Sequence, residues 1–341
     1  MITAQSLKER WATFKQENPK TRIRDAAKQL GVSEAELVAT QIGETVRRLE
    51  GDFRELLKDV PALGYVMALT RNDTIVHERK GVYENVSFTN QTGLVLGPDI
   101  DLRLFMSHWH FGFAVAENDR KSLQFFDQDG LAVHKIYLTD TSDLEAYEAL
   151  VQKYLATDQT VPVITVPYPE KTKEITAERV DVQAFQADWL AMQDTHEFFG
   201  LLRKHNLERE QGLQIAPKGH AEQISVEQFR KVFEMAAQRE LPIMIFASSP
   251  GCIQIHTGLV RKLVSMGSWY NVLDPEFNMH LRVDQINSIW VTRKPTKDGI
   301  VTGLDLFDQE GNTIALIFGK RKPGVPEMKE WQDVVREAIA A

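Results

Sequence analysis

The chain repeats itself at a nearly constant spacing, and this duplication limits the folds that it can adopt. Residues 101–116 read DLRLFMSHWHFGFAVA, and residues 280–293 open with the related string HLRVDQINSIWVTR. Further on, FFDQDG at 125–130 matches LFDQEG at 306–311. Upstream, Trp11 and Trp189 stand at nearly the same offset. Two similar halves therefore share one fold, and a residue present in only one half is a candidate for function.

Composition is compatible with two ordinary soluble domains. The chain has 341 residues, of which 43% are hydrophobic and 26% charged, values typical of globular proteins. The formal net charge of −8 argues against a surface that follows nucleic-acid phosphates. Cys252 is the single cysteine, which excludes an intrachain disulfide and a cysteine metal cluster.

The chain ends and the hydropathy pattern predict a cytoplasmic protein. The N-terminal string MITAQSLKERW has no apolar core of the kind that a signal peptide requires. No apolar run approaches the length needed to span a bilayer. We therefore expect cytoplasmic localisation and no membrane insertion.

The order of periodic segments predicts an α+β fold in tandem. Helices are expected at 21–30, 33–41 and 44–58, then short strands between Tyr65 and Leu138, then a helix at 143–157. The second half repeats this order, with helices at about 184–206 and 225–239, strands from Pro242 to Phe318 and a terminal helix at about 326–340. Each half is thus an antiparallel β-sheet flanked by helices. The expected domains are 1–160 and 184–341, joined by a polar, proline-bearing linker at 161–183.

Residues 24–41, RDAAKQLGVSEAELVATQ, have the pattern of a helix-turn-helix. A DNA-reading helix needs basic or amide side chains at its exposed start. Here the second helix begins with Ser33-Glu34-Ala35-Glu36, and carboxylates repel phosphate. A helical hairpin that caps the sheet is favoured over a DNA-binding regulator, and no nucleic-acid partner is expected.

His196 is a histidine of the second half without a counterpart near Asn18 in the first half. In a helix, His196, Phe199, Gly200 and Arg203 share one face. An imidazole beside an aromatic ring and a glycine fits a flat apolar ligand that carries a metal, and imidazole is an ordinary axial ligand of haem iron. The competing interpretation is a partly exposed helix histidine without function.

Two further clusters carry polar groups. His108-Trp109-His110 is expected on a strand, where alternate side chains share a face. A zinc site would need a third ligand, and none is evident. Basic residues gather at Arg293-Lys294 and at Lys320-Arg321-Lys322, at neighbouring strand ends. They form either a solvated rim or a clamp for the carboxylates of a ligand whose apolar body lies over the sheet.

Several strings together resemble the cytoplasmic haemin-utilisation proteins of the HemS/ChuS/HmuS family of Gram-negative bacteria. They are VHERKGVYENV (76–86), DIDLRLFMSHWHFGFAVAE (99–117), GCIQIHTGLV (251–260), WYNVLDPEFNMHLR (269–282) and LFDQEGNTIALIFGKR (306–321). The strings occur in order along essentially the whole chain, duplication included. The resemblance implies two tandem repeats and one haem (iron protoporphyrin IX), bound mainly by the second.

The resemblance also assigns roles to individual residues. It implies His196 of DTHEFFG as the axial iron ligand, with His205 near enough in sequence to be an alternative. It implies that Arg103 acts at the other haem face, with Phe105 on the same side of its strand. The remaining residues implied for the site are Arg209, Lys294 and Arg321 as partners of the propionates, and Phe246 and Phe318 as walls.

Two functions share these residues, so the sequence does not separate them. In the first, the protein receives imported haem and opens the ring to release iron, with an external electron donor because no flavin or nicotinamide motif is present. In the second, it carries or stores haem and passes it intact to a separate oxygenase. The implied partners are haem, the cytoplasmic side of a haem ABC importer and a haem oxygenase. Whether the first half binds a second haem is left open.

Overall fold

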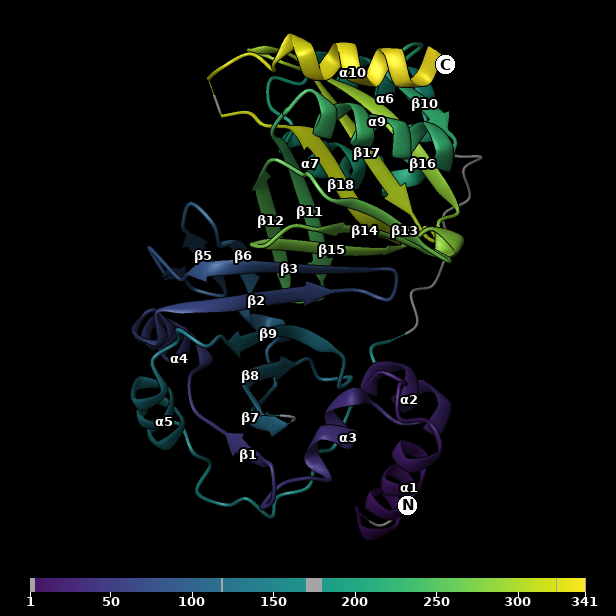
Figure 1. The fold of residues 1–341 in the computed structure, drawn as a ribbon. Helices are drawn as coiled ribbons and strands as arrows, with labels where there is room; N and C mark the ends of the chain where they lie inside the picture. Colours follow the sequence, from purple (N-terminus) through teal and green to yellow (C-terminus); the bar gives the residue numbers. More distant parts are fainter. Residues whose placement is uncertain (1–3, 118, 170–179, 323, 341) are drawn as a thin grey trace. The chain divides into compact units, whose positions relative to one another are not determined.

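The structure is a computed structural model that describes residues 4–117, 119–169, 180–322 and 324–340, and it divides into two compact units (Figure 1). Unit 1 contains Met1–Arg71, Glu78–Glu170 and Ser248–Gln254. Unit 2 contains Asn72–His77, Lys171–Ala247 and Ile255–Ala341. Each unit therefore includes one short segment from the other half of the sequence. Of the linker predicted at 161–183, residues 170–179 lie outside the described residues.

Unit 1 is built on antiparallel strands in the order β1-β7-β8-β9-β2-β3, and β4-β5-β6 form a second run. The strands are β1 Val46–Leu49, β2 Tyr65–Arg71, β3 Ile75–Val82, β4 Ser87–Thr89, β5 Thr92–Leu96, β6 Asp101–Phe105, β7 Phe111–Glu117, β8 Arg120–Phe126 and β9 Ala132–Leu138. The helices are α1 Ala4–Glu17, α2 Ile23–Leu30, α3 Glu34–Ala39, α4 Phe53–Asp59 and α5 Leu144–Lys153.

The helices of unit 1 cover both faces of its sheet. Leu56 of α4 and Leu150 of α5 pack with Ala68, Leu123 and other buried strand residues on one face. On the other face, Ala35 and Val38 of α3 pack with Phe113, Phe126 and Ala132. Burying an apolar side chain of this size stabilises the fold by roughly 1.5–3 kcal/mol, so both helix groups are held by apolar contact.

Unit 2 repeats this plan, with strands in the order β10-β16-β17-β18-β11-β12 and a second run β13-β14-β15. The strands are β10 Ala221–Ile224, β11 Ile243–Ser249, β12 Cys252–Gly258, β13 Leu263–Met266, β14 Trp269–Leu273, β15 Phe277–Arg282, β16 Ser288–Thr296, β17 Gly299–Phe307 and β18 Thr313–Gly319. The helices are α6 Val182–Ala191, α7 Glu197–Lys204, α8 Arg209–Gln214, α9 Val226–Gln238 and α10 Lys329–Ala340.

In unit 2 the long helices α9 and α10 bury the larger core. Phe229 and Phe233 of α9 and Trp331 of α10 pack with Ile245, Leu304 and their strand neighbours. The shorter helices α6, α7 and α8 pack on the opposite face, where their apolar side chains contact Trp290 and Phe307.

Matching details in the two units confirm the predicted α+β tandem repeat. The amide of His110 donates to the carbonyl of Phe126, and the amide of Asn287 donates to the carbonyl of Phe307, both at 2.8 Å. Each pair joins the start of a strand, β7 or β16, to the end of its neighbour. Helices α3 and α8 each begin with a capping box, at Ser33 and at Glu208. These residues occupy the same places in the two copies of one fold.

Two predicted helices are wrong in their extent. The expected helix at 44–58 is strand β1 followed by α4, because Val46 pairs with Val115 at the sheet edge and Asp52 caps a new helix. Gly51, with φ of 106°, allows the chain to turn between them. The expected helix at 184–206 is two helices, because α6 ends at Ala191 and α7 begins after His196. Short strands such as β10 and β13 were not predicted.

The helix-turn-helix pattern at 24–41 forms two helices that are tied to the sheet. Gly31 adopts the left-handed conformation between α2 and α3, as the sequence pattern suggests. Glu34, 2% exposed, lies at the first turn of α3 and forms a buried ion pair of 2.6 Å with Lys135 of β9. Arg24 is 4.0 Å from the same carboxylate. The start of α3 is therefore buried rather than presented to a partner, which fits the hairpin interpretation.

A buried chain of hydrogen bonds in unit 1 surrounds His134. The Tyr83 hydroxyl is 2.6 Å from Nε2 of His134, and the Thr70 hydroxyl is 2.8 Å from Nδ1. Thr70 in turn donates to Sγ of Cys252 at 3.4 Å. A neutral imidazole with its proton on Nδ1 satisfies all three contacts. Burial lowers the pKa of His134 to about 3 and raises the pKa of Cys252 to about 12, so neither group carries charge at neutral pH.

We expect this histidine to make the fold sensitive to acid. Its folded-state pKa lies below the unfolded value of 6.5, so the unfolded chain binds one more proton as pH falls through that interval. The free energy of unfolding should drop by up to about 1.4 kcal/mol per pH unit on this account. Urea unfolding at pH 7.5, 6 and 5 should show a shallower drop in His134→Gln than in the parent. If the free energy of unfolding falls equally with pH in the parent and in His134→Gln, this role of His134 is contradicted.

None of the helices within the described ranges is long and apolar enough to cross a membrane.

Candidate functional site

One face of the unit 2 sheet is only half covered. The helices α6, α7 and α8 pack over Trp290 of β16 and Phe307 of β17. On the neighbouring strands, alternate residues that point away from the α9–α10 core stay half-buried. These are Met244 and Phe246 of β11 and Leu316 and Phe318 of β18. We call this set the open face.

A glycine shapes the open face. The rings of Phe246 and Phe318 meet edge to face, with centroids 5.6 Å apart. Gly303 of β17 is the strand partner of Phe318. A Cβ atom at Gly303 would lie 2.5 Å from the Phe318 ring, which is too close for any side chain. The missing side chain therefore lets the ring lie flat across the neighbouring strand and form an apolar surface.

Helix α7 carries the exposed stripe that the sequence predicts. His196 is its N-cap, with a side chain that is 88% exposed and an Nδ1 atom 2.6 Å from the Asp194 carboxylate. Phe199 is 67% exposed, and a Cβ atom at Gly200 would meet nothing within 4 Å. The Arg203 guanidinium lies 6.0 Å from the Phe199 ring centroid. An imidazole, an open aromatic ring and a cation thus follow one another along one side of the helix.

One end of the stripe can be placed against β18. At the start of α7, the pKa of Asp194 is lowered by the backbone N–H of His196, with a smaller effect from Arg321, which follows β18. At the end of α7, a hollow of about 530 Å³ is lined by Phe199, Arg203, Arg209 and Thr313, the first residue of β18. The Phe199–Arg203 end of the stripe therefore lies beside the start of β18.

Arg209 and Lys294 converge on one buried carboxylate. Asp305 is fully buried, and its Oδ2 atom is 2.7 Å from Nε of Arg209 and 3.8 Å from Nζ of Lys294. Although burial raises the pKa of Asp305, the two cations bring it below the usual value. Burial lowers the pKa of Lys294 to about 8. Lys294 is 2% exposed, whereas the partly exposed Arg209 reaches the hollow beside α7.

The other predicted residues take separate positions. His205 ends α7 with Nε2 bonded to Asp188 at 2.6 Å and its ring against Phe185, and its side chain is largely buried. Arg103 and Phe105 lie in unit 1 on β6, where Arg103 pairs with Asp101 and both residues are at least partly exposed. His196, Phe246, Phe318, Arg209 and Arg321 thus belong to unit 2, whereas Arg103 and Phe105 belong to unit 1.

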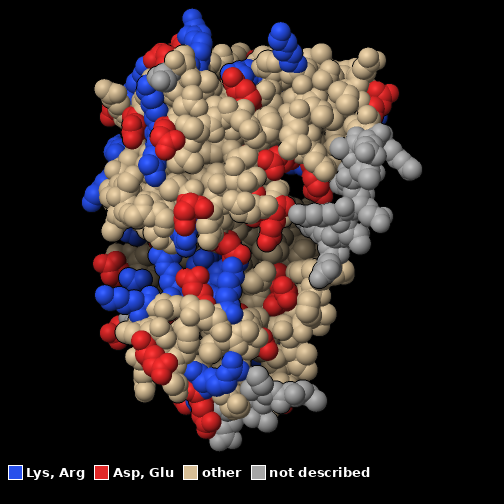
Figure 2. Space-filling model, turned by 90° about the vertical axis from the view of Figure 1, so that its right-hand side faces the viewer, with Lys and Arg blue, Asp and Glu red and all other residues tan. Residues whose placement is uncertain are grey.

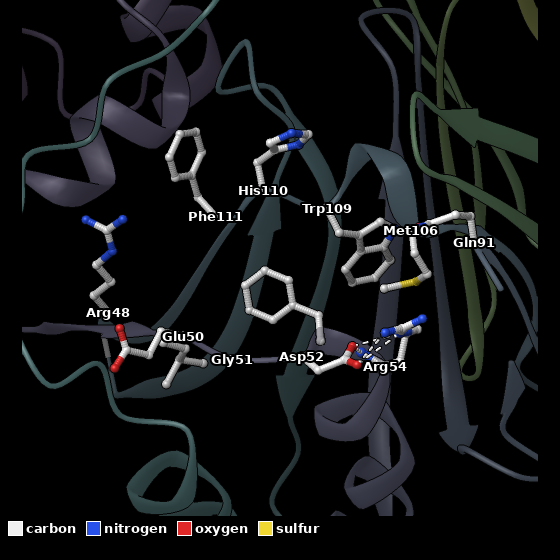
Figure 3. Close-up of a pocket in the computed structure, with 12 residues that line it drawn as sticks. Arg48, Glu50, Gly51, Asp52, Arg54, Gln91, Met106, Trp109, His110 and Phe111 are labelled. Carbon is white, nitrogen blue, oxygen red and sulfur yellow. Dashed lines mark hydrogen bonds and ion pairs between the residues drawn. The ribbon is translucent and has the colours of Figure 1, made fainter.

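The His108-Trp109-His110 motif does not lie on a strand as expected. His108 ends a 3₁₀ turn and bonds to Tyr168, while His110 precedes β7. Figure 3 shows the hollow of about 390 Å³ that His110 borders together with Trp109, Phe111, Arg48 and Arg54. Among the described residues, no group of three His, Cys, Asp or Glu side chains could hold a metal ion.

Charge is mixed over the surface. Figure 2 shows Lys and Arg side chains gathered in a group on one face, with Asp and Glu side chains beside and between them. The net charge of −8 therefore does not describe a uniformly acidic surface, and local anion sites are compatible with it.

Sequence reasoning missed the groups that hold the site residues in place. Asp305 aligns Arg209, Asp194 orients His196, and Gly303 admits the Phe318 ring. The string Asp-Thr-His at 194–196 carried a usable signal, because an aspartate two residues before a histidine can fold back on it. Asp305 and Arg209 are 96 positions apart, so no local sequence pattern predicts their ion pair.

Comparisons with known proteins agree with this architecture. A family model described as the haemin-degrading HemS.ChuX domain matches residues 31–154 and 206–338. The chain is 39% identical to the hemin transport protein HemS of Yersinia enterocolitica over 337 residues, 97% of each chain. It is similar to apo-PhuS, a heme-binding protein from Pseudomonas aeruginosa, with a TM-score of 0.95, 44% identity and coverage of 98% and 99%. For the heme degrading enzyme ChuS of Escherichia coli O157:H7 the TM-score is 0.92, with 35% identity and the same coverage.

Proposed function

Because this chain belongs to the family of haemin-degrading HemS.ChuX-domain proteins, we propose that it binds one haem on the open face of unit 2. The observation that carries the proposal is the stripe of α7, where His196 and Phe199 stand exposed and Phe199 borders a hollow that it shares with the start of β18. A haem needs an imidazole for the iron, apolar walls and cations for its two propionates. In unit 2, α7 supplies an exposed imidazole, β11 and β18 supply aromatic side chains, and Arg209 and Arg321 supply cations.

His196 is suited to the iron by its hydrogen bond. The Asp194 carboxylate at 2.6 Å from Nδ1 holds the ring proton on that nitrogen and leaves the lone pair on Nε2. A carboxylate partner of this kind orients an imidazole ligand and raises its basicity. The largely exposed side chain is open to a ligand, whereas the Nε2 atom of His205 is already bonded to Asp188.

The remaining groups are assigned by exposure. Phe246 and Phe318 form the wall on which the ring rests, and Arg209 and Arg321 are the proposed partners of the propionates. Lys294 is buried behind Arg209 on the shared carboxylate of Asp305. We assign it to positioning Arg209 rather than to direct contact with the ligand.

We propose further that the protein opens the haem ring and releases iron, with an electron donor supplied from outside. Two names support this choice, that of the matching family, a haemin-degrading domain, and that of a similar protein, a heme degrading enzyme. The alternative, a carrier that transfers intact haem, is favoured by the name of the hemin transport protein HemS. The haem-loaded protein should be incubated with ascorbate and catalase, because free peroxide also bleaches haem. Loss of the Soret band with release of iron supports degradation, and a persistent Soret band supports the carrier.

Arg103→Ala is expected to separate binding from turnover. We propose that Arg103 contributes to turnover rather than to binding, so its removal should leave haemin affinity within about threefold while degradation slows roughly 10- to 100-fold. The rate of Soret loss measures this. Arg282→Ala is the matched control, since Arg282 is the repeat counterpart of Arg103 and is held by Asp284 as Arg103 is held by Asp101. Equal turnover in the parent and Arg103→Ala would remove the role assigned to Arg103.

A further inference from the structure

The hollow of unit 1 in Figure 3 takes no part in the proposed haem site. It lies where β1 ends, α4 begins and the chain enters β7, and its volume is about 390 Å³. This volume lies within the range of about 300–1,000 Å³ that small-ligand sites occupy. Three aromatic side chains line it, those of Phe53, Trp109 and Phe111. The hollow therefore has the size and the apolar walls of a site for a small flat molecule.

The strand register shows which residues of unit 2 correspond to these walls. Gly112 of β7 is the strand partner of the last residue of β1, and Ile289 of β16 is the strand partner of the last residue of β10. The three residues before them, 109–111 and 286–288, are Trp-His-Phe in unit 1 and Ile-Asn-Ser in unit 2. Unit 1 thus has three side chains with rings where unit 2 has none. Since the two units share one fold, this difference is a candidate for function.

Two further differences make room for the hollow. In unit 1 the residues Glu50 and Gly51 separate β1 from the N-cap of α4, whereas in unit 2 Ser225 caps α9 directly after β10. A Cβ atom at Gly112 would lie 2.7 Å from the Phe53 ring, so the glycine allows this ring to lie against β7. The inserted residues and the glycine therefore belong to the same copy as the aromatic walls.

The charged groups around the hollow leave one cation available. Arg54 and Asp52 are joined by side-chain hydrogen bonds of 2.6 to 3.0 Å. The Oε1 atom of Glu50 accepts from the amide and the hydroxyl of Thr157 at 2.8 and 2.9 Å. Arg48 donates to a backbone carbonyl at 2.8 Å and, among the described residues, forms no ion pair. Both carboxylates of the lining are thus bonded to other groups, while the Arg48 guanidinium keeps free donors.

The free polar groups favour an anionic ligand. His110 is exposed, and within the described part of the chain its ring nitrogens have no hydrogen-bond partner. A guanidinium binds a carboxylate or a phosphate through two parallel hydrogen bonds, and an imidazole can add a third donor. Figure 3 shows Arg48 and Phe111 on one side of the hollow and Trp109 on the other. A ring and an anionic group can therefore be held at the same time.

We propose that this hollow binds a small aromatic anion, a molecule with one or two fused rings that carries a carboxylate or a phosphate. The rings contact Phe53, Trp109 and Phe111, and Arg48 holds the anionic group. The site is independent of the haem proposal, because the hollow lies in unit 1 and none of the residues assigned to haem lines it.

Equilibrium dialysis of the full chain tests the site with two probes, naphthoate for an aromatic carboxylate and adenosine monophosphate for an aromatic phosphate. We expect at least one probe to bind at about one molecule per chain. Arg48→Gln should weaken this binding about tenfold, because a charge-assisted hydrogen bond is replaced by a neutral one. Phe111→Ser introduces the residue of unit 2 and should weaken binding about fivefold, because one aromatic wall is lost.

Arg47→Gln is the matched control for the arginine variant. Arg47 precedes Arg48 in β1, pairs with Glu148 and lies outside the hollow, so its replacement should leave binding unchanged. Circular dichroism of each variant establishes that it is folded. If Arg48→Gln does not fold, Phe111→Ser decides the test.

The outcomes identify the ligand class or overturn the site. Binding of naphthoate alone identifies an aromatic carboxylate, binding of adenosine monophosphate alone identifies a nucleotide phosphate, and binding of both supports the shared chemistry. The site is overturned if neither probe binds saturably, if Arg48→Gln and Phe111→Ser bind as the parent does, or if Arg47→Gln loses as much binding as Arg48→Gln. Binding that is lost in Arg321→Gln and kept in Arg48→Gln places the probe in unit 2 and also overturns the site.

Discussion

His196→Ala is expected to lower haemin affinity by roughly 100-fold and to shift the Soret maximum. Removing even an outer partner of a metal ligand typically lowers affinity 10- to 100-fold, and here the proposed ligand itself is removed. The side chain is exposed and makes its polar contact to Asp194, so its loss should leave the fold intact. A haemin titration followed by visible absorbance on parent and variant measures both effects.

Two companion variants make this result specific. His205→Ala should keep the parent spectrum, because His205 is largely buried and bound to Asp188. Asp194→Asn should weaken binding about tenfold, since it removes the charge that orients the His196 ring. If the affinity and the spectrum change in His205→Ala and not in His196→Ala, the iron ligand is His205. If neither changes, the haem site lies elsewhere.

Asp305→Ala is expected to lower the free energy of unfolding by about 3 kcal/mol at pH 7. Removing one partner of a buried ion pair typically destabilises a protein by about 3–5 kcal/mol. The lower end applies because Arg209 is partly exposed and Lys294, with its pKa near 8, readily loses its proton. Urea unfolding measures the effect. Asp333→Ala removes an exposed pair with Arg336 and should change stability by less than about 1 kcal/mol.

The pH dependence of Asp305→Ala tests its cause. Without Asp305 the pKa of Lys294 falls further below 10.5, so between that lower pKa and pH 8 the folded variant has released a proton that its unfolded chain still binds. In this interval the free energy of unfolding of the variant rises with pH relative to that of the parent. The deficit should therefore be larger at pH 6 than at pH 8. An equal deficit at both would mean that packing, and not charge, explains the loss. Haemin binding by the folded variant should also weaken, because Arg209 loses its anchor.

Local pattern was sufficient where structure is local. The Leu-Gly-Val-Ser string at 30–33 predicts a helix end, a left-handed glycine and a capped second helix. Gly31 adopts the left-handed conformation and Ser33 caps α3, as predicted. The pattern failed where a distant strand decides. Val46 and Leu49 have helical spacing with Phe53, yet they form β1 because Val115 and Gly112 offer a free sheet edge. The segment 46–49 is a strand and not a helix because it pairs with β7, which lies more than sixty positions away in the sequence.

The sequence by itself determined the duplication, the α+β class and the family, because repeated strings and their order can be recognised without knowing how the chain folds. It also singled out His196, because a histidine present in one copy and absent from the other is visible in the letters. Only the tertiary structure decided which side chains are available. In the sequence Lys294 and Arg209 are both cations and nothing separates them. In the structure both contact Asp305, but Lys294 is buried and Arg209 is partly exposed. Exposure and charge pairing depend on residues far apart in the chain, and packing alone brings them together.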